Sequence, residues 1–406
     1  MLMNPAILVI NCGSSSIKIA VIAPETGISL LTGIADRVGT DEASIEVEFG
    51  EKSYSLEITG ADHAQAIDRI LSELDGWLEG SAEVVAVGHR VVHGGEAFPK
   101  AATIDADVIA KIEACSTLAP LHNPVNLVGI RAVEKARPAL PQVAVFDTAF
   151  HQTLPEYAYL YAIPYELYKE KGIRRYGFHG TSHQYVAQAT AQEKGKPVQE
   201  LGFVTLHLGN GCSAAAVQGG KSMDTTMGLS PLEGMVMGTR SGNVDPDLPR
   251  FLNEQLGMDP KEVSQTLNRK SGLLGLSGTS NDMRTLSEAA ENGDEAATRA
   301  IGVFCYRAAK AVMEMAVALE SLDGIIFTGG IGENSRMVRA QIIEHLHVMG
   351  VEISQVLNAQ VPRGETCCLS TERSGCEVWV TPTKEELMIA QQTFANIDIL
   401  NTTAAQ

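Results

Sequence analysis

The stretch AILVINCGSSSIKIAVI at residues 6–22 sets the plan of the chain, because an apolar strand, a turn of small residues and a second apolar strand follow one another. The stretch FVTLHLGNGCSAAAV at residues 203–217 has the same order. A repeat at a separation of about 200 residues is too long for a solenoid and indicates two similar domains.

Other segments extend this mixed α/β pattern, which alternates apolar runs with helical periodicity. Further strands are expected at residues 84–87, 143–146 and 325–328, and helices at residues 64–79 and 296–322. A helix is also expected to begin at Asn123-Pro124, with Asn123 as its cap, and a last helix at Glu385. A Gly-rich turn is expected at residues 329–334, and a domain boundary near residues 150–155.

Composition excludes several classes of protein. The net charge is −18, from 31 basic and 49 acidic residues, so the chain lacks the basic surface of a nucleic-acid binder. No apolar run approaches the roughly 20 residues that span a bilayer, and the start has no basic segment of a secretory signal. Seven cysteines without a C-x-x-C pair indicate reduced thiols in a cytoplasmic protein.

Two turns have the composition of anion-binding loops. In the first, residues 11–18, three serine hydroxyls and the backbone N–H groups form an anion cradle, Lys18 adds a positive charge, and Asn11 offers an oxygen suited to magnesium. The second turn, residues 208–213, fits a phosphate-binding hairpin better than a dinucleotide fingerprint, because a strand follows where a helix is needed. The alternative for the first turn is an ordinary polar hairpin.

Charged side chains beside glycines complete the candidate site. Arg90 follows a strand and suits bidentate binding of a carboxylate or phosphate, while Arg240 and His179 lie in similar Gly-rich settings. Asp147 ends a buried strand, where a charge is costly without a role. The alternatives are a surface arginine, a core histidine and, for Glu385, an acid that complements a helix dipole. Together these groups favour phosphoryl transfer between anions, which depends on positioning and charge neutralisation.

Taken as a set, the motifs resemble the acetate and propionate kinase family. The resemblance covers nearly the whole chain and rests on segments 9–18, 88–95, 146–153, 176–183, 207–211, 231–234, 238–242 and 328–334. It implies the fold of sugar kinases, heat-shock proteins and actin, which consists of two ribonuclease-H-like domains, each a mixed sheet flanked by helices, with the active-site cleft between them. The first domain would span residues 1–150, completed by the helix at about 386–406, and would carry acyl-kinase residues. The second, residues 151–385, would bind nucleotide and dimerise.

The resemblance also implies residue roles. The catalytic residues would be Asp147, His179 and Arg240. The substrate-binding residues would be Arg90, Val92, Leu121, Phe178 and Pro231. The ATP-binding residues would be Lys18, His207, Leu208, Gly209, Asn210, Gly211, Asp282, Met283, Arg284, Gly330, Ile331, Gly332, Glu333 and Asn334. Asn11 and Glu385 would hold Mg²⁺, or Mn²⁺ in its place.

The implied activity is reversible transfer of the γ-phosphoryl group of ATP to acetate, which gives acetyl phosphate and ADP, in a cytoplasmic homodimer without nucleic-acid or membrane partners. One alternative is a kinase of the same family that prefers propionate. Another is a nucleotide-gated binding protein of the actin or chaperone type. The chain departs from the family at three positions: Cys212 replaces the usual alanine, Asn243 a common aspartate and Lys384 a common asparagine.

Overall fold

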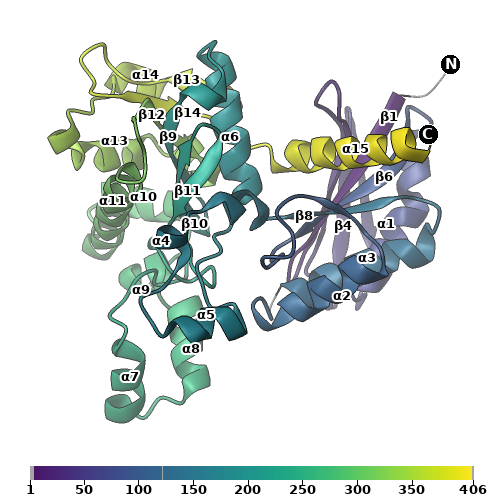
Figure 1. Ribbon diagram of the computed structural model, residues 1–406, viewed down its shortest axis with the longest axis horizontal. Coiled ribbons are helices and arrows are strands. Elements are labelled where there is room, and N and C mark those ends of the chain that lie inside the picture. Colours follow the sequence, from purple (N-terminus) through teal and green to yellow (C-terminus); the bar gives the residue numbers. More distant parts are fainter. Residues whose placement is uncertain (1–3, 121, 405–406) are drawn as a thin grey trace. The chain divides into compact units, whose positions relative to one another are not determined.

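The computed structural model describes residues 4–120 and 122–404, which divide into two units (Figure 1). The first unit holds the described residues up to Phe150 together with those from Lys384 onward, and the second unit holds residues 151–383. Each unit is built around one mixed β-sheet with helices on its faces. The last segment of the chain therefore belongs to the same unit as the first.

The sheet of the first unit has the strand order β5-β4-β3-β2-β1-β6-β8-β7. Its strands are β1 (Asn4–Cys12), β2 (Ile17–Ala23), β3 (Ile28–Asp36), β4 (Ser44–Phe49), β5 (Lys52–Glu57), β6 (Ala82–Val91), β7 (Ala102–Thr103) and β8 (Gln142–Phe146). Strand β1 is antiparallel to β2 and parallel to β6, which is parallel to β8. The carboxyl ends of β1, β6 and β8 therefore meet at one edge of this sheet.

Helices cover both faces of the first sheet. They are α1 (His63–Leu78), α2 (Ala106–Ala114), α3 (Asn123–Ala136) and α15 (Glu385–Ala404), with a short 3₁₀ turn η1 (Cys115–Thr117). The apolar face of α1, with Ile67, Ile70 and Leu74, packs into one core, and α15 places Ile389 and Ala390 in the core on the other face. Figure 1 shows α15, in yellow, across the strands.

Gly88 allows α15 to lie close to β6. A Cβ at this position would lie 2.4 Å from Thr393 Oγ1 and 2.9 Å from Ile389 Cγ2, which is closer than real contacts permit. The glycine two residues before Arg90 thus sets the distance between the last helix and the strand that carries this arginine.

The second unit contains a smaller sheet with the order β11-β10-β9-β12-β14-β13. Its strands are β9 (Gly202–Leu208), β10 (Cys212–Gln218), β11 (Lys221–Thr225), β12 (Gly324–Thr328), β13 (Cys367–Cys368) and β14 (Glu377–Val380). Its helices are α4 (Glu156–Tyr159), α5 (Tyr165–Lys171), α6 (Gly180–Glu193), α7 (Leu248–Leu256), α8 (Pro260–Arg269), α9 (Gly272–Ser277), α10 (Met283–Glu291), α11 (Glu295–Ala316), α12 (Gly329–Asn334), α13 (Arg336–Glu344) and α14 (Gln355–Ala359). Three further 3₁₀ turns are η2 (Ala149–Thr153), η3 (Val198–Glu200) and η4 (His347–Met349).

The expected duplication is confirmed by the strand orders. The series β3-β2-β1-β6-β8 in the first sheet corresponds to β11-β10-β9-β12-β14 in the second. In both, the central strand is antiparallel to the strand that follows it in sequence and parallel to its neighbour on the other side. The repeated strand–turn–strand stretches are β1–β2 and β9–β10, so the sequence pattern marks the centre of each sheet.

Three expectations about local structure are wrong. The helix expected to reach residue 322 ends at Ala316, because Ala318 and Leu319 turn back onto the carbonyls of Met315 and Ala316. Residues 329–334, expected as a turn, form the short helix α12. Asn123 does not cap α3; its side chain instead bonds to the backbone of His93, and His122 occupies the cap position.

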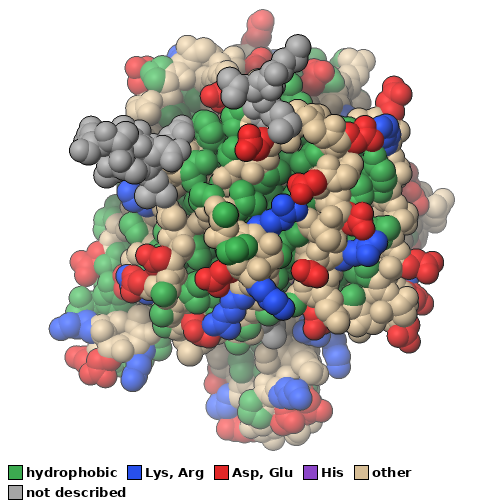
Figure 2. Space-filling model, turned by 90° about the vertical axis from the view of Figure 1, so that its right-hand side faces the viewer, with side chains coloured by type: hydrophobic (Ala, Val, Ile, Leu, Met, Phe, Trp, Pro, Cys, Tyr) green, Lys and Arg blue, Asp and Glu red, His purple; other side chains and the backbone are tan. Residues whose placement is uncertain are grey.

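The surface agrees with the composition. Among the described residues, no helix combines the length and the apolar character that crossing a membrane demands. On the face drawn in Figure 2, Lys and Arg side chains are scattered among Asp and Glu and do not gather into one basic patch.

Candidate active site

Asn11 and Lys18 are direct partners across the antiparallel pair β1–β2. Side chains of directly paired residues lie on the same face of a sheet, so the amide and the ammonium group project to one side. The connecting turn is closed by the N–H of Gly13, which donates to the carbonyl of Ser16 at 2.8 Å. The turn leaves Ser14 and Ser15 exposed, as a loop that accepts an anion requires.

Arg90 forms the central ion pair of the first unit. Its Nε donates to Asp147 Oδ1 at 2.9 Å and its Nη2 to Asp147 Oδ2 at 2.6 Å, in the bidentate geometry typical of strong arginine–carboxylate pairs. A longer bond of 3.4 Å runs from Nη1 to Asn11 Oδ1. The remaining N–H groups of this guanidinium meet no acceptor among the described residues and are available to an anion.

The ends of parallel strands bring these two residues together. Arg90 pairs with Val145 between β6 and β8, and Asp147 follows β8 directly, with its N–H donating to the carbonyl of Val91 at 3.0 Å. The Asp147 side chain is only 2% exposed. A carboxylate this deeply buried needs a charged partner, and Arg90 supplies it. The nearby carboxylates and the Asp147 bond raise the pKa of Arg90 against the opposing effect of burial, so this arginine stays charged.

Two asparagines of α3 fix the loop that follows β6. Asn126 accepts the N–H of Val92 at 3.1 Å and donates to the carbonyl of Cys12 at 3.0 Å. Asn123 accepts the N–H of His93 at 3.1 Å and donates back to its carbonyl at 2.9 Å. The half-buried Val92 is therefore held beside the end of β1. Leu121, expected in the same pocket, lies outside the described residues.

Glu385 begins α15 in a cluster of acidic groups. Burial raises the pKa of Glu385, the charges of Asp147 and Glu386 raise it further, and Arg90 and Lys18 oppose them. Carboxylate and amide oxygens are the ligands that Mg²⁺ prefers, and a cation relieves the repulsion between crowded carboxylates. Glu385 and Asn11 therefore fit the magnesium ligands expected from the sequence, although the described residues contain no group of three or more His, Cys, Asp or Glu side chains arranged to hold a metal on their own.

In the second unit, His179 adopts a left-handed backbone conformation (φ 57°) immediately before α6. Such a conformation is uncommon for a residue with a side chain and costs free energy. His179 Nδ1 shares a hydrogen bond of 2.8 Å with Ser213 Oγ, and its ring stacks on that of His207 at 4.3 Å between centroids. The imidazole is thus fixed between the start of α6 and the β9–β10 hairpin.

Arg240 lies beside His179. A Cβ placed on Gly211 would be 3.5 Å from both Arg240 Nη1 and the ring of His179, so the glycine leaves room between the two side chains. Arg240 Nη1 donates to the carbonyl of Pro231 at 3.4 Å, and no acidic residue of the described chain pairs with this arginine. Burial lowers the pKa of Arg240. A half-buried guanidinium without a carboxylate partner is suited to binding an anion.

A cavity of about 860 Å³ opens next to the β9–β10 turn. Its walls include eight of the expected nucleotide-binding residues, namely Gly209, Asn210, Asp282, Met283, Arg284, Gly330, Ile331 and Asn334. Asp282 caps α10 by accepting the N–H groups of Arg284 and Thr285. Volume and lining suit a ligand of the size of a nucleotide.

The other expected nucleotide-binding residues of this unit are not among the residues that line the cavity. The Glu333 carboxylate accepts the N–H of Gly329 at 3.0 Å and that of Thr383 at 3.1 Å. Gly329 has φ 75°, and a Cβ there would lie 2.7 Å from the carbonyl of Leu208, so only glycine fits this turn. His207, Leu208, Gly211 and Gly332 are likewise absent from the lining. They belong to the end of β9, the β9–β10 turn and α12, which adjoin the lining residues Gly209, Asn210 and Gly330.

Sequence reasoning missed part of this wall. The additional lining residues are Asn281, Ser287, Glu288, Glu291, Ser335, Arg336, Met337 and Arg363. Asn281 was detectable, because it precedes the Asp282 motif, and it donates to Asn210 Oδ1 at 3.0 Å. Arg363 carries no local signal, since it reaches the cavity only through the fold.

Comparison with known proteins identifies the family of this chain. The model of the Acetokinase family matches residues 6–391. The chain belongs to the acetokinase family. An acetate kinase of Ectopseudomonas mendocina is 52% identical over 97% of this chain and 99% of its own length. Two crystal structures resemble this chain, each at a TM-score of 0.91. A propionate kinase of Francisella tularensis is 44% identical over 96% of this chain and 99% of its own. An acetate kinase of Porphyromonas gingivalis is 41% identical over 97% of this chain and 100% of its own.

Cys212 lies beside the nucleotide-binding turn. The thiol is fully buried and donates to the carbonyl of Gly209 at 3.1 Å. Burial raises its pKa to about 12. Because the thiolate is the reactive form, the thiol beside the nucleotide-binding turn is expected to resist oxidation.

Two buried histidines, His89 and His151, should make the stability of the protein depend on pH. Burial lowers the pKa of His89 and His151 to about 4 in the folded state, from an ordinary value of 6.5. Both histidines stabilise the fold fully above pH 6.5, and this contribution is lost as the pH falls toward 4, because the unfolded chain takes up the protons first. Between pH 6.5 and pH 4, each of the two histidines is expected to lower the free energy of unfolding by about 1.4 kcal/mol for every pH unit.

Urea unfolding between about pH 7.5 and about pH 5 measures this slope. His89→Gln, which removes one titrating group, should reduce the slope. An unchanged slope in this variant would show that His89 does not contribute.

Proposed function

We propose that this protein is an acetate kinase, which reversibly transfers the γ-phosphoryl group of ATP to acetate. An acetate oxygen forms a bond to the γ-phosphorus while the bond from that phosphorus to the β,γ-bridging oxygen breaks, so that acetyl phosphate and ADP result. Acetate is already ionised at neutral pH, so no base has to remove a proton. The observation that carries the proposal is Arg240, a half-buried arginine without a carboxylate partner beside His179 and the β9–β10 turn.

The nucleotide role belongs to the second unit in this proposal. ATP binds in the 860 Å³ cavity, whose Gly209 and Asn210 belong to the turn after β9 and whose Gly330 lies in α12, directly after β12. Arg240 and His179 stabilise the phosphoryl group during transfer. Positioned positive charges and hydrogen-bond donors supply most of the catalysis in phosphoryl transfer.

The first unit carries the acyl role. The N–H groups of Arg90 that Asp147 and Asn11 leave available bind the carboxylate of acetate, and Asp147 fixes the orientation of the guanidinium. Val92 contributes to the apolar pocket for the methyl group, and Lys18 contacts ATP. Asn11 and Glu385 would hold Mg²⁺, which would supply charge neutralisation for the transferring group.

The proposal extends to assembly and compartment. Exposed apolar side chains on α5 and α7, among them Leu167, Phe251 and Leu256, support a homodimer formed through the second unit. The seven free cysteines support a reducing compartment, the cytoplasm.

Hydroxamate trapping tests the function directly. Purified protein with acetate, ATP and Mg²⁺ should yield acetohydroxamate in proportion to ADP. A nucleotide-gated binding protein of the actin or chaperone type would release ADP and phosphate without any acyl phosphate, and that result would refute the proposal.

The pocket residue Val92 predicts the choice of acid. Valine occupies the space of an additional methylene, which in an apolar pocket is worth roughly 1–3 kcal/mol, or about 10–200-fold. The kcat/KM for acetate should therefore exceed that for propionate. Val92→Ala should reduce the ratio of the two values, mainly by lowering KM for propionate, since Arg90 still holds the carboxylate.

The measurement is kcat and KM for both acids with wild type and variant. Val133→Ala, at a buried position of α3 in the same unit, controls for a general loss of packing. Equal efficiencies in wild type, or an unchanged ratio in Val92→Ala, would contradict the pocket assignment and favour a propionate-preferring enzyme.

A further inference from the structure

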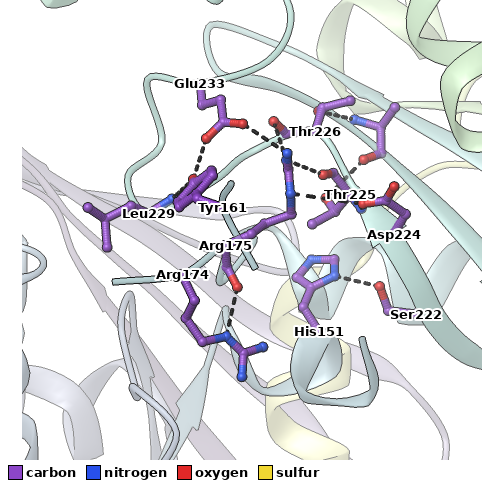
Figure 3. A network of polar contacts seen from close by, with 11 residues as sticks. His151, Tyr161, Arg174, Arg175, Ser222, Asp224, Thr225, Thr226, Leu229 and Glu233 are labelled. Carbon is purple, nitrogen blue, oxygen red and sulfur yellow. Dashed lines mark hydrogen bonds and ion pairs between the residues drawn. The ribbon is translucent and has the colours of Figure 1, made fainter. Parts of the chain in front are cut away.

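Tyr161, Arg175 and Glu233 come from separate segments of the second unit and form a polar network centred on the Glu233 carboxylate (Figure 3). This network is here called the Glu233 clamp. Arg175 Nη2 donates to Glu233 Oε1 at 2.9 Å, and the hydroxyl of Tyr161 donates to Glu233 Oε2. The same hydroxyl accepts the N–H of Leu229 at 2.8 Å. Both oxygens of one carboxylate are therefore used within the clamp.

Arg175 also connects the clamp to the end of β11. Its Nη1 donates to the carbonyl of Thr225 at 2.6 Å and to that of Thr226 at 3.1 Å, and Asp224 lies 4.0 Å from its Nε. The guanidinium thus joins the strand end to the segment that carries Glu233. Side-chain exposures of 20% for Arg175 and 30% for Glu233 make this pair better shielded from water than the exposed ion pairs of α7.

The clamp fills a space that the backbone leaves for it. A Cβ on Gly228 would lie 1.7 Å from Glu233 Oε2 and 2.1 Å from the Tyr161 hydroxyl oxygen, so a side chain there would displace both clamp residues. The carbonyl of Gly228 accepts the N–H of Tyr176 at 3.1 Å. The clamp is therefore packed directly against the backbone at Gly228, which is itself bonded to Tyr176.

Catalytic residues lie at both ends of this network. Pro231, whose carbonyl accepts Arg240 Nη1, lies between the clamped Leu229 and Glu233. At the other end, Arg175 precedes His179 by four residues, and the carbonyl of Phe178 in this interval lies 3.0 Å from His151 Nε2. The ion pair of the clamp thus ties the segment of His179 to the segment that holds Arg240.

We propose that the Glu233 clamp positions Arg240 and His179 for phosphoryl transfer without touching the substrates, an inference that rests on the proposed kinase function. Its members are positioning residues. Glu233 holds the Pro231 carbonyl against Arg240, and Arg175 holds the chain that leads to His179. Loosening the clamp shifts the guanidinium from the place where negative charge develops, and a shift of about 1 Å costs about 10²-fold in rate.

The test uses Glu233→Gln, which keeps the size of the side chain but removes the charge, and Tyr161→Phe, which removes one hydroxyl. We expect kcat to fall about 10²-fold in Glu233→Gln and about 10-fold in Tyr161→Phe, with KM for ATP unchanged, because the nucleotide cavity contains neither residue. Asp247→Asn, which breaks an exposed ion pair to Arg250 in the same unit, is the matched control and should keep wild-type kcat.

A mutant cycle separates positioning from general structural support. Each clamp variant is also made in the Arg240→Ala background, where a residue that acts through Arg240 should lose most of its effect on kcat. The proposal would be overturned if a clamp variant lowered kcat by the same factor in the wild-type and the Arg240→Ala backgrounds. Wild-type kcat in clamp variants that are folded would also overturn it. So would unfolding of Tyr161→Phe, as measured by circular dichroism. Failure of wild type and of Asp247→Asn to form acyl phosphate would instead refute the proposed function.

Discussion

Arg240→Ala is expected to lower kcat by about 10³–10⁵-fold while ATP still binds, because an arginine that neutralises a phosphoryl transition state is typically worth this much. The guanidinium lies beside His179 and Gly211 and forms no ion pair in the described chain, so its charge is available to the transferring group. It does not line the nucleotide cavity, and the ground-state affinity for ATP should therefore change little.

Turnover by hydroxamate trapping and the Kd of ATP by calorimetry measure the two quantities separately. Arg250→Ala, which removes an exposed arginine of α7, controls for loss of a positive charge from the same unit. A turnover within tenfold of wild type in Arg240→Ala would remove this arginine from the mechanism.

The second large effect is expected for Asp147→Asn. The amide keeps the size of the side chain but offers one acceptor and one donor where the guanidinium of Arg90 needs two acceptors. Arg90 should lose its fixed orientation, with a fall in kcat/KM for acetate of about 10²-fold or more. Because acetate needs no deprotonation, the variant should keep the shape of the wild-type pH–rate profile.

The pH–rate profile decides whether Asp147 orients Arg90 or transfers a proton. If one limb of the wild-type profile disappears in Asp147→Asn, proton transfer is the role of this carboxylate. Wild-type activity and magnesium dependence in the variant would contradict both roles. Asp75→Asn, which breaks an exposed pair with Arg137 in the same unit, is the control.

Periodicity was sufficient for elements whose burial is regular. The helix predicted at residues 64–79 corresponds to α1 (His63–Leu78), and the strand predicted at residues 84–87 is the centre of the longer β6. Strands β3 to β5 were missed because buried and exposed side chains mix along β3 and β4, and β5 is largely exposed, so none of the three strands is buried along its whole length as β8 and β12 are. The early end of α11 was not predictable from periodicity, because Leu319 continues the apolar spacing beyond the point where the chain turns back; beyond it, Asp323 bonds to Gly202 at the start of β9.

For the candidate site, residue types beside glycines were predictable, but their partners were not. Arg90 and Asp147 each have a local signal, whereas their bidentate pairing depends on the parallel alignment of β6 and β8 across 57 residues of sequence. Asn126 joins two strand ends without any motif of its own. The Glu233 clamp joins three distant segments and is likewise invisible in sequence.

The composition of the first unit from both ends of the chain has a consequence for synthesis on the ribosome. The core between the first sheet and α15 contains Ile7 and Val9 near the start of the chain and Ile389 near its end. Until α15 emerges, that face of the sheet has no cover and remains open to chaperones or to aggregation. All residues of the second unit have by then been made. The part of the protein that is translated first is therefore completed last, and a nascent chain that stops before residue 385 should fold its second unit alone.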